Sequence, residues 1–385
     1  ALNVWKTFNM KTFGDYHDIY LKTDVLLLAD IFENFRKLCL NYYRLDPAHY
    51  YGTPGISWDA CLKMSGETIE LVTNSDMYLF LERAKRGGMS FIGHRLAEAN
   101  NKYMKDFDPK KESSYLMYFD ANSLYSKAMC YPLPVGNFKW ITEKRKQFIL
   151  NKFKSKEYNF FLECNIKYPK KLHDHHVDYP LAPEQMIIDD VFKNLPYCEK
   201  IRTKFAKEGI KINKSKVPKL VSTLTDKKNY IVHARLLEYY LQLGLKIKPI
   251  KILTFTEKPW MKKYIEFNID KRMKSKNAFE TKFFKLMNNA PYGKTMENVR
   301  KHCNHSIVTS EDAALKHIAN PLFKTLNKMN NKFILIDKYK ASVTLDKPIF
   351  CGVAILDYSK LIMYRYHYSL FKNFYGDKLR LLMTD

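Results

Sequence analysis

The stretch YFDANSLY, residues 118–125, decides how the fold of this chain is interpreted. The apolar residues before Asp120 predict a buried strand over 113–121, and the Ser-Leu-Tyr run after it predicts an immediate turn into a helix. A carboxylate at the end of a buried strand is costly unless a positive group faces it. Mg²⁺ is one such group, since it binds few carboxylates together with phosphate oxygens. Capping of the following helix is the ordinary alternative for Asp120, and both interpretations stay open.

A second stretch, KFFKLMNNAPYGK (282–294), predicts a helix with one polar face. The side chains that share this face at spacings of three and four are Lys282, Lys285, Asn289 and Tyr292. Two ammonium groups, an amide and an aromatic ring suit a triphosphate with its sugar and base. Gly293 follows at once, and Arg272 lies earlier on the same basic segment. A solvated basic face is the alternative explanation for the lysines alone.

The third stretch is KLRLLMTD at the end of the chain. Leu379, Leu381 and Leu382 predict a short buried strand, with Asp385 at its end. Asp385 could be the second carboxylate of a metal site that includes Asp120. Two metals held by carboxylates from separate strands would activate a hydroxyl and stabilise a leaving pyrophosphate.

Composition points to a polyanionic partner. The chain has 385 residues, 46% of them apolar, which is room for two or three domains. Lys and Arg number 65 against 40 Asp and Glu, a formal net charge of +25. Nucleic acid is the first candidate partner for such an excess, and a merely basic protein is the alternative. The 27 Tyr and 25 Phe favour nucleic acid, because aromatic rings among cations can stack on bases.

Compartment and completeness are also predicted from the sequence. The seven cysteines are scattered without a C-x-x-C pair, which argues against a zinc ribbon or a disulfide framework and for a reducing compartment. There is no signal peptide and no apolar run of membrane-spanning length, so we expect an intracellular protein that does not enter a membrane. The chain begins ALNVWKTF without a Met and ends within KLRLLMTD, so we expect a fragment.

The rest of the chain predicts a mixture of helices and strands of the α/β or α+β class. Residues 17–40 have the spacing of an amphipathic helix, whose buried stripe would be Leu28, Ile31, Phe35 and Leu38. Residues 141–220 are lysine-rich and broken by prolines, which favours an insertion over a second core. Residues 226–245 predict a strand followed by a helix, or one helix, and 246–255 predict a strand. Residues 298–345 predict a second, irregular insertion.

Taken together, DANSLYSKAM, KLMNNAPYGK and the truncated LLMTD resemble motifs A, B and C of the family B DNA polymerases. The family patterns are D-x-x-S-L-Y-P, K-x-x-x-N-S-x-Y-G and Y-x-D-T-D-S. The order, spacing and insertions are most similar to the protein-primed subgroup of phages, adenoviruses, linear plasmids and Maverick/Polinton-type transposons, the last above all. Nuclear localisation follows if a eukaryotic transposon encodes the chain.

This resemblance implies an α+β fold with a polymerase palm, an antiparallel sheet with helices, and helical fingers. The C-terminal part of an RNase H-like exonuclease domain would precede them. The implied segments are 1–60 (exonuclease part), 61–140 (linker and palm with motif A), 141–220 (priming-type insertion), 221–256 (palm), 257–297 (fingers with motif B), 298–345 (second insertion) and 346–385 (palm ending inside motif C).

The resemblance also implies roles for individual residues. Asp120 and Asp385 would be catalytic and, with the Ala121 carbonyl, would bind two Mg²⁺ ions. Tyr125 would be the steric gate that excludes a ribose 2′-OH. The implied nucleotide-binding residues are Tyr125, Lys285, Asn289, Tyr292 and Gly293, helped by Lys282 and Arg272. The KRGG stretch resembles a template-contacting Y-x-G-G element made here of Lys85, Arg86, Gly87 and Gly88. Tyr20 and Asp24 match the Y-x-x-x-D pattern of the third exonuclease motif.

The implied reaction is DNA-directed addition of dNTPs to a DNA or terminal-protein primer, by a monomer bound to template and primer. Several positions depart from the family pattern. Ala290 replaces a serine, and Pro291 in mid-helix would remove the bond to the Met287 carbonyl, costing about 3 kcal/mol. Two exonuclease motifs, the second motif C aspartate and the thumb would lie outside the chain. We therefore expect this polypeptide to be inactive alone. The alternative is a non-catalytic, DNA-binding relic of a mobile element or virus polymerase.

Overall fold

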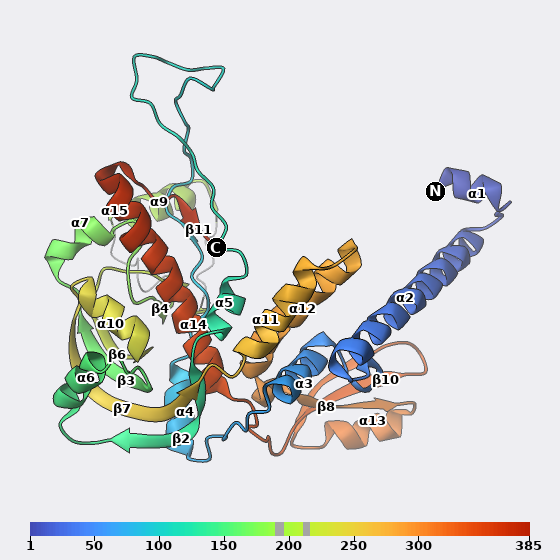
Figure 1. Cartoon of the computed structure of the whole chain (residues 1–385). Coiled ribbons are helices and arrows are strands. Elements are labelled where there is room, and N and C mark those ends of the chain that lie inside the picture. The colour runs from blue at the N-terminus through green and yellow to red at the C-terminus, as the bar shows by residue number, and fades with distance from the viewer. Residues whose placement is uncertain (189–195, 211–215) are drawn as a thin grey trace.

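The computed structural model describes residues 1–188, 196–210 and 216–385, which form a mixed α+β fold (Figure 1). The helices are α1 (Leu2–Thr7), α2 (Phe13–Tyr43), α3 (Thr53–Ser65), α4 (Ser75–Arg83), α5 (Leu124–Met129), α6 (Arg145–Lys154), α7 (His173–His176), α9 (Pro196–Lys207), α10 (Ala234–Gln242), α11 (Lys262–Met273), α12 (Ala278–Thr295), α13 (Glu311–Ile318), α14 (Ile349–Tyr364) and α15 (Lys372–Tyr375). The strands are β1 (Phe91–Ile92), β2 (Leu133–Ile141), β3 (Phe160–Lys167), β4 (Glu184–Met186), β5 (Lys219–Val221), β6 (Lys227–His233), β7 (Lys246–Lys258), β8 (Cys303–Val308), β9 (Phe323–Lys328), β10 (Ile334–Tyr339) and β11 (Met383–Thr384). Among the described residues, no helix is both long and apolar enough to cross a bilayer.

The largest sheet is antiparallel and four-stranded, with the strand order β2-β7-β3-β6. Strand β3 pairs on both sides, with Phe161 opposite Leu253 of β7 and His233 of β6. Both faces of β3 are covered, because Phe161 packs into one core cluster while Phe160 and Leu162 pack into another. A strand buried on both faces is continuously apolar, as FFLEC is.

The interpretation of residues 141–220 as an insertion outside the core was therefore wrong for β3 and its neighbours. Ile149, Tyr168 and Leu181 also belong to the second core cluster. The error arose because lysines and prolines surround a short apolar strand, and composition averaged over the whole segment hid it. Parts of 141–220 lie outside the described residues.

Helix α14 joins the two core clusters. Its first half, from Ile349 to Tyr358, packs in one cluster, and Leu361 and Tyr364 pack in the other. Nearly every side chain of α14 is buried. The helix continues as a π-helix over Arg365–Phe371 and then as α15. The expected strand-then-helix over 226–245 is confirmed, as β6 followed by α10.

Helices α11 and α12 form a hairpin that packs against α3 (Figure 1). The Asn277 side chain caps α12 by accepting a 2.9 Å hydrogen bond from the Glu280 amide. Helix α12 runs unbroken through Pro291. The segment boundary expected between residues 60 and 61 falls inside α3, so the chain does not divide there.

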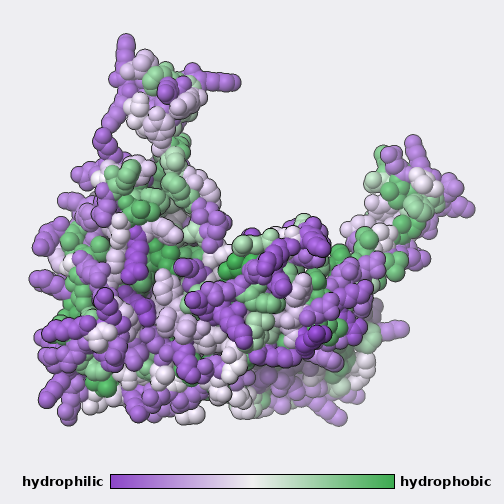
Figure 2. Space-filling model, in the orientation of Figure 1, coloured by the Kyte–Doolittle hydropathy of each residue, from purple (hydrophilic) through white to green (hydrophobic). Residues whose placement is uncertain are grey.

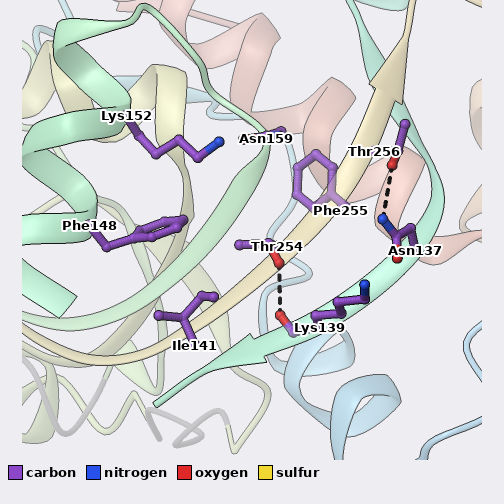
Figure 3. Close-up of a pocket in the computed structure, with 9 residues that line it drawn as sticks. All are labelled: Asn137, Lys139, Ile141, Phe148, Lys152, Asn159, Thr254, Phe255 and Thr256. Atoms are coloured by element: carbon purple, nitrogen blue, oxygen red, sulfur yellow. Dashed lines mark hydrogen bonds between the residues drawn. The ribbon is translucent and has the colours of Figure 1, made fainter. Parts of the chain in front are cut away.

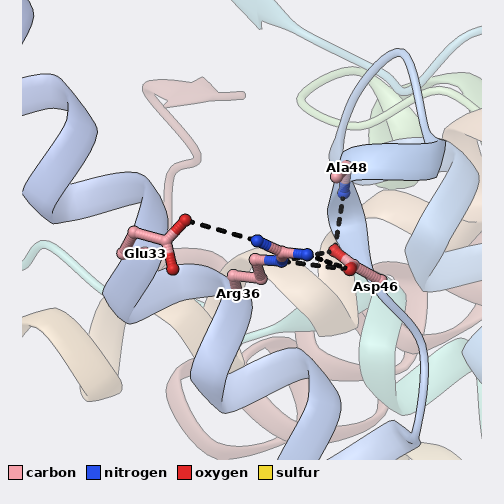
Figure 4. Close-up of polar contacts among 4 residues, drawn as sticks. All are labelled: Glu33, Arg36, Asp46 and Ala48. Carbon is pink, nitrogen blue, oxygen red and sulfur yellow. Dashed lines mark hydrogen bonds and ion pairs between the residues drawn. The ribbon is translucent and has the colours of Figure 1, made fainter.

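Helix α2 projects away from the rest of the molecule (Figure 1). Its start is fixed by a capping box between Thr12 and Asp15. At its C-terminal end, Arg36 pairs with Asp46 at 2.7 Å and with Glu33 at 3.5 Å (Figure 4). Figure 2 shows hydrophobic colour gathered on the projecting N-terminal part.

The stripe predicted for the helix over 17–40 is only half buried. Phe35 and Leu38 pack against the core, but Leu28 and Ile31 are 64% and 51% exposed. The physical reason is that the helix extends past its neighbours, so no described residue covers its first half (Figure 1). Periodicity predicted the helix and its apolar face. How much of that face is buried depends on the length over which other elements pack against it, which the local sequence does not set.

Residues 298–345 are regular rather than irregular. They contain an antiparallel sheet of order β8-β10-β9, with α13 packed against it. This sheet shares no strand with the four-stranded sheet.

The buried strand expected over 113–121 is absent, which is a further correction. Residues 115–120 are not assigned to a strand, and Met117 and Tyr118 are 68% and 79% exposed. A strand requires a neighbour that takes up its backbone hydrogen bonds. Among the described residues, this segment has only an isolated bridge between Ser114 and Asn100, and no strand pairs with residues 115–120.

The C-terminal strand is also displaced from its expected place. Leu379, Leu381 and Leu382 are only partly buried and lie before the strand, since β11 is Met383–Thr384, which pairs with β1.

Candidate functional site

A pocket of about 340 Å³ brings the first two sequence motifs together. Its lining residues are Asp120, Asn122, Ser123, Leu124, Tyr125, Arg272, Lys285, Asn289 and Tyr292. They come from the turn before α5, from the end of α11 and from one face of α12. The volume is in the range of small-molecule sites.

The turn into α5 places the first group of residues. Ser123 has left-handed backbone angles, φ 54° and ψ 46°, which are unusual for a residue other than glycine and cluster at functional sites. Beyond the turn, Ser126, Ala128 and Met129 are buried and hold α5 in place. Asn122, Ser123 and Leu124 were not predicted as site residues, although they lie within the quoted DANSLY stretch.

Two aromatic rings face each other in the pocket. Tyr125 and Tyr292 stack with ring centroids 4.6 Å apart and an interplanar angle of 22°. Both side chains are partly buried, and burial raises the pKa of each hydroxyl above its ordinary value. Each hydroxyl therefore stays neutral at physiological pH and keeps both a donor and an acceptor.

The charge of the pocket suits an anion. Arg272 and Lys285 line it, and neither has an ion pair to any described residue. Asp120 is the single carboxylate among the lining residues. Two cations and one carboxylate give the pocket a net positive charge. This charge suits phosphate oxygens, which guanidinium and ammonium groups bind well.

The carboxylates present do not fit a two-metal site. Asp385 is exposed and does not line the pocket, and neither does Ala121. Among the described residues, no group of three or more His, Cys, Asp or Glu side chains could hold a metal. Asp120 alone fits one Mg²⁺ that also binds phosphate oxygens of a ligand. Asp385 lies elsewhere because β11 pairs with β1 and not with the segment that carries Asp120.

Other predicted nucleotide-binding residues lie outside the pocket. Lys282 is exposed one turn before Lys285 on α12, and it does not line the cavity. Gly293 is exposed, with nothing within 4 Å of the place where a Cβ would lie. Tyr20, which is 58% exposed, and Asp24 lie on the projecting part of α2.

The four residues of the KRGG stretch differ in their contacts and exposure. The guanidinium of Arg86 lies 3.7 Å from the Tyr230 ring centroid and donates a 2.6 Å hydrogen bond to the Ile231 carbonyl. Arg86 therefore packs against β6, and its proposed contact with DNA stays a prediction. Lys85 is partly exposed, and Gly87 has open space around it. Gly88 lies against the hydroxyl of Tyr125.

A second pocket, of about 230 Å³, lies between α6 and strands β2 and β7 (Figure 3). Thr254 donates a 3.0 Å hydrogen bond to the Lys139 carbonyl at its edge, and Lys152 is paired with Glu157. No residue singled out from the sequence lines it, and no carboxylate does. The first pocket is the better candidate because chemistry predicted from separate motifs converges there.

Comparisons with known proteins identify the family of the chain. Residues 9–370 match the family described as DNA polymerase type B, organellar and viral. No match was found among curated protein sequences. A structure of Phi29 DNA polymerase in an orthorhombic crystal form is similar at 13% identity and a TM-score of 0.48, over 88% of this chain and 48% of that one.

Two further structures of Phi29 DNA polymerase are similar at 14% identity and a TM-score of 0.45. One is complexed with primer-template DNA, and the other with primer-template DNA and incoming nucleotide substrates. Each match covers 83% of this chain and 46% of that one, so the chain spans a little under half of the solved polymerases. The family match extends over most of the sequence, and the chain belongs to the organellar and viral type B DNA polymerases.

Proposed function

We propose that the pocket between α5 and the α11–α12 hairpin binds the incoming dNTP of a template-directed DNA polymerase. The observation that carries the proposal is the convergence of Asp120, Tyr125, Lys285 and Tyr292 in one cavity. These residues come from two motifs far apart in the sequence, and each motif predicted nucleotide chemistry independently. Family membership supports the same function.

Each lining side chain has a role in this proposal. Lys285 and Arg272 bind the triphosphate, and Asn289 and Tyr292 contact the sugar and base. Tyr125 lies flat on Tyr292 and closes the side of the pocket where a ribose 2′-OH would project. Asp120 would hold one Mg²⁺ that accompanies the nucleotide, and the ion would neutralise phosphate charge.

The proposed reaction is attack of a primer 3′-hydroxyl on the α-phosphorus of the dNTP. The 3′-oxygen forms a new ester bond to that phosphorus as its proton passes to solvent. The bond between the α-phosphorus and the oxygen that bridges it to the β-phosphorus breaks, and pyrophosphate leaves with that oxygen. A terminal-protein hydroxyl would replace the 3′-hydroxyl in protein priming. We assign the four-stranded sheet with α10 and α14 to the palm, and the α11–α12 hairpin to the fingers. Residues 298–345 and the region around β4 and β5 are proposed insertions of the protein-primed subgroup.

One observation favours the alternative, a DNA-binding chain without catalysis. Asp120 is the single carboxylate of the pocket, whereas nucleotidyl transfer by two metals requires more. The +25 charge would still bind DNA.

The test is template-dependent nucleotide selection by the chain itself. A fluorescent primer-template is titrated with protein in Mg²⁺, with each of the four dNTPs present in turn. A dNTP pocket predicts that the nucleotide complementary to the template base tightens DNA binding at least fivefold, and that the other three do not. Equal DNA affinity with all four nucleotides would support the DNA-binding alternative and contradict the proposal.

A further inference from the structure

Gly88 touches the residue that we propose as the sugar gate. A Cβ atom built on Gly88 would lie 2.8 Å from the hydroxyl oxygen of Tyr125, closer than real Cβ contacts. The conflict is with the tip of a side chain and not with backbone, so an added methyl group would move the Tyr125 ring. Nothing else lies within 4 Å of that Cβ position.

The backbone at Gly88 is held from both sides. Before it, Arg86 lies over the Tyr230 ring and bonds to the Ile231 carbonyl at 2.6 Å. After it, Met89 is buried, and its sulfur accepts hydrogen bonds from Ser222 at 3.1 Å and Tyr364 at 3.5 Å. These anchors lie in the sheet and its core, so the segment cannot easily move away from Tyr125 to make room for a side chain.

The Tyr125 ring is limited on its face as well as at its tip. Its face stacks on Tyr292 at a centroid distance of 4.6 Å, and its hydroxyl lies against Gly88. The ring thus occupies one position between two contacts. A displaced tip would tilt the ring off Tyr292 and change how the ring closes the pocket.

We propose that Gly88 is a specificity-determining residue, which sets the position of Tyr125 and thereby the preference of the pocket for deoxyribose over ribose. The inference rests on the proposed dNTP site. Gly88 would thus influence the nucleotide pocket by way of Tyr125, in addition to any contact with a template strand. Gly88 acts through Tyr125 and is a positioning residue.

The test compares Gly88→Ala with Gly87→Ala. Gly87 is its neighbour, and a Cβ added there meets nothing within 4 Å. Equilibrium binding of dATP and ATP is measured calorimetrically with Mg²⁺ and without DNA, so template contacts do not enter. We expect Gly88→Ala to reduce the dATP-to-ATP affinity ratio at least fivefold and Gly87→Ala to leave it within twofold. In a Tyr125→Phe background, which removes the contacted hydroxyl, adding Gly88→Ala should change the ratio less than twofold.

A second measurement does not depend on nucleotide binding. Tyrosine labelled with ¹³C at Cζ reports the surroundings of each hydroxyl, and Tyr125→Phe assigns the resonance of Tyr125. The Tyr125 resonance should shift in Gly88→Ala and stay in place in Gly87→Ala. A Gly88→Ala protein that matches Gly87→Ala in both measurements overturns the inference. If the wild-type chain binds neither nucleotide, the proposed function fails, and the selectivity role fails with it, whatever the resonance shows.

Discussion

The hydroxyl of Tyr264 donates a 2.9 Å hydrogen bond to the carbonyl oxygen of Met287. Pro291 cannot donate a backbone hydrogen bond to this oxygen. In an α-helix the carbonyl of residue 287 would accept from the amide of residue 291, and proline has no amide hydrogen. The bond crosses from α11 to α12, and both groups are buried. Helix α12 therefore continues through Pro291 because a neighbouring helix supplies the missing donor.

Removal of that hydroxyl should cost more stability while Pro291 is present than after Pro291 is replaced. We expect Tyr264→Phe to lower the free energy of unfolding by about 1–3 kcal/mol, because a buried carbonyl loses its partner. In a Pro291→Ala background the new amide can serve Met287, so the same change should cost about 1 kcal/mol less. Urea unfolding of the four proteins measures the coupling. Additive effects of the two substitutions would contradict the compensation.

Substitutions of Arg86 and Lys85 should have opposite effects, one on stability and the other on DNA affinity. Arg86→Lys keeps the charge but loses the planar contact with Tyr230 and the bond to the Ile231 carbonyl. We expect it to lower the free energy of unfolding by about 1–2 kcal/mol and to leave DNA affinity within twofold.

Lys85→Gln removes a charge from the surface and should lower DNA affinity while leaving stability nearly unchanged. DNA affinity should fall severalfold at low salt, with the unfolding free energy changed by less than about 0.5 kcal/mol. Denaturant titration and fluorescence anisotropy with labelled duplex measure the two effects. A DNA-binding loss without a stability loss in Arg86→Lys would place Arg86 on the DNA-binding surface. A stability loss in Lys85→Gln would contradict the surface role of Lys85.

Lys360 should make a contribution to stability that rises with pH above neutrality. Burial lowers the pKa of Lys360 to about 8, while Asp357, 3.8 Å away, opposes the shift and Arg86 adds to it. In the unfolded chain the amine stays protonated up to about pH 10.4. Between these values the unfolded state binds more protons, so the free energy of unfolding increases with pH. The expected increase is on the order of 2 kcal/mol.

Substitution of Lys360 tests the assignment. Urea unfolding at pH 7.5 and pH 10 gives the change in the free energy of unfolding with pH, which should be more favourable in wild type than in Lys360→Met. The buried cysteines and tyrosines, whose raised pKa values lower stability at high pH, contribute equally to both proteins. Asp357→Asn combined with Lys360→Met removes both buried charges and keeps an acceptor for the His233 amide, which bonds to Asp357 at 2.9 Å. An unchanged pH dependence in both variants would mean that Lys360 does not titrate in this range.

Sequence alone predicted the candidate pocket better than it predicted the fold around it. Tyr125, Lys285, Asn289 and Tyr292 were expected to act together, and they line one cavity. Helical spacing accounts for this success, because Lys285, Asn289 and Tyr292 share a face of α12 wherever the helix packs. Lys282 shares that face in the sequence, but it lies one turn beyond the cavity.

The failures concern features that depend on distant partners. The run before Asp120 has strand composition, but no strand in the described part of the chain pairs with it. Pro291 signalled a kink, and only the packing of Tyr264 on another helix removes the need for one. The contact of Gly88 with Tyr125 has no signal beyond a glycine pair, since it requires two segments to meet.

The central claim is that the pocket binds a dNTP, and a matched pair of lysines tests it most directly. Lys285 lines the pocket, and Lys282 lies exposed one turn earlier on the same helix. The measurement is equilibrium binding of dATP in Mg²⁺ to wild type, Lys285→Ala and Lys282→Ala. We predict that Lys285→Ala weakens dATP binding at least tenfold and that Lys282→Ala weakens it less than threefold. Equal losses in the two variants, or no binding by the wild-type chain, would contradict a nucleotide site at this pocket.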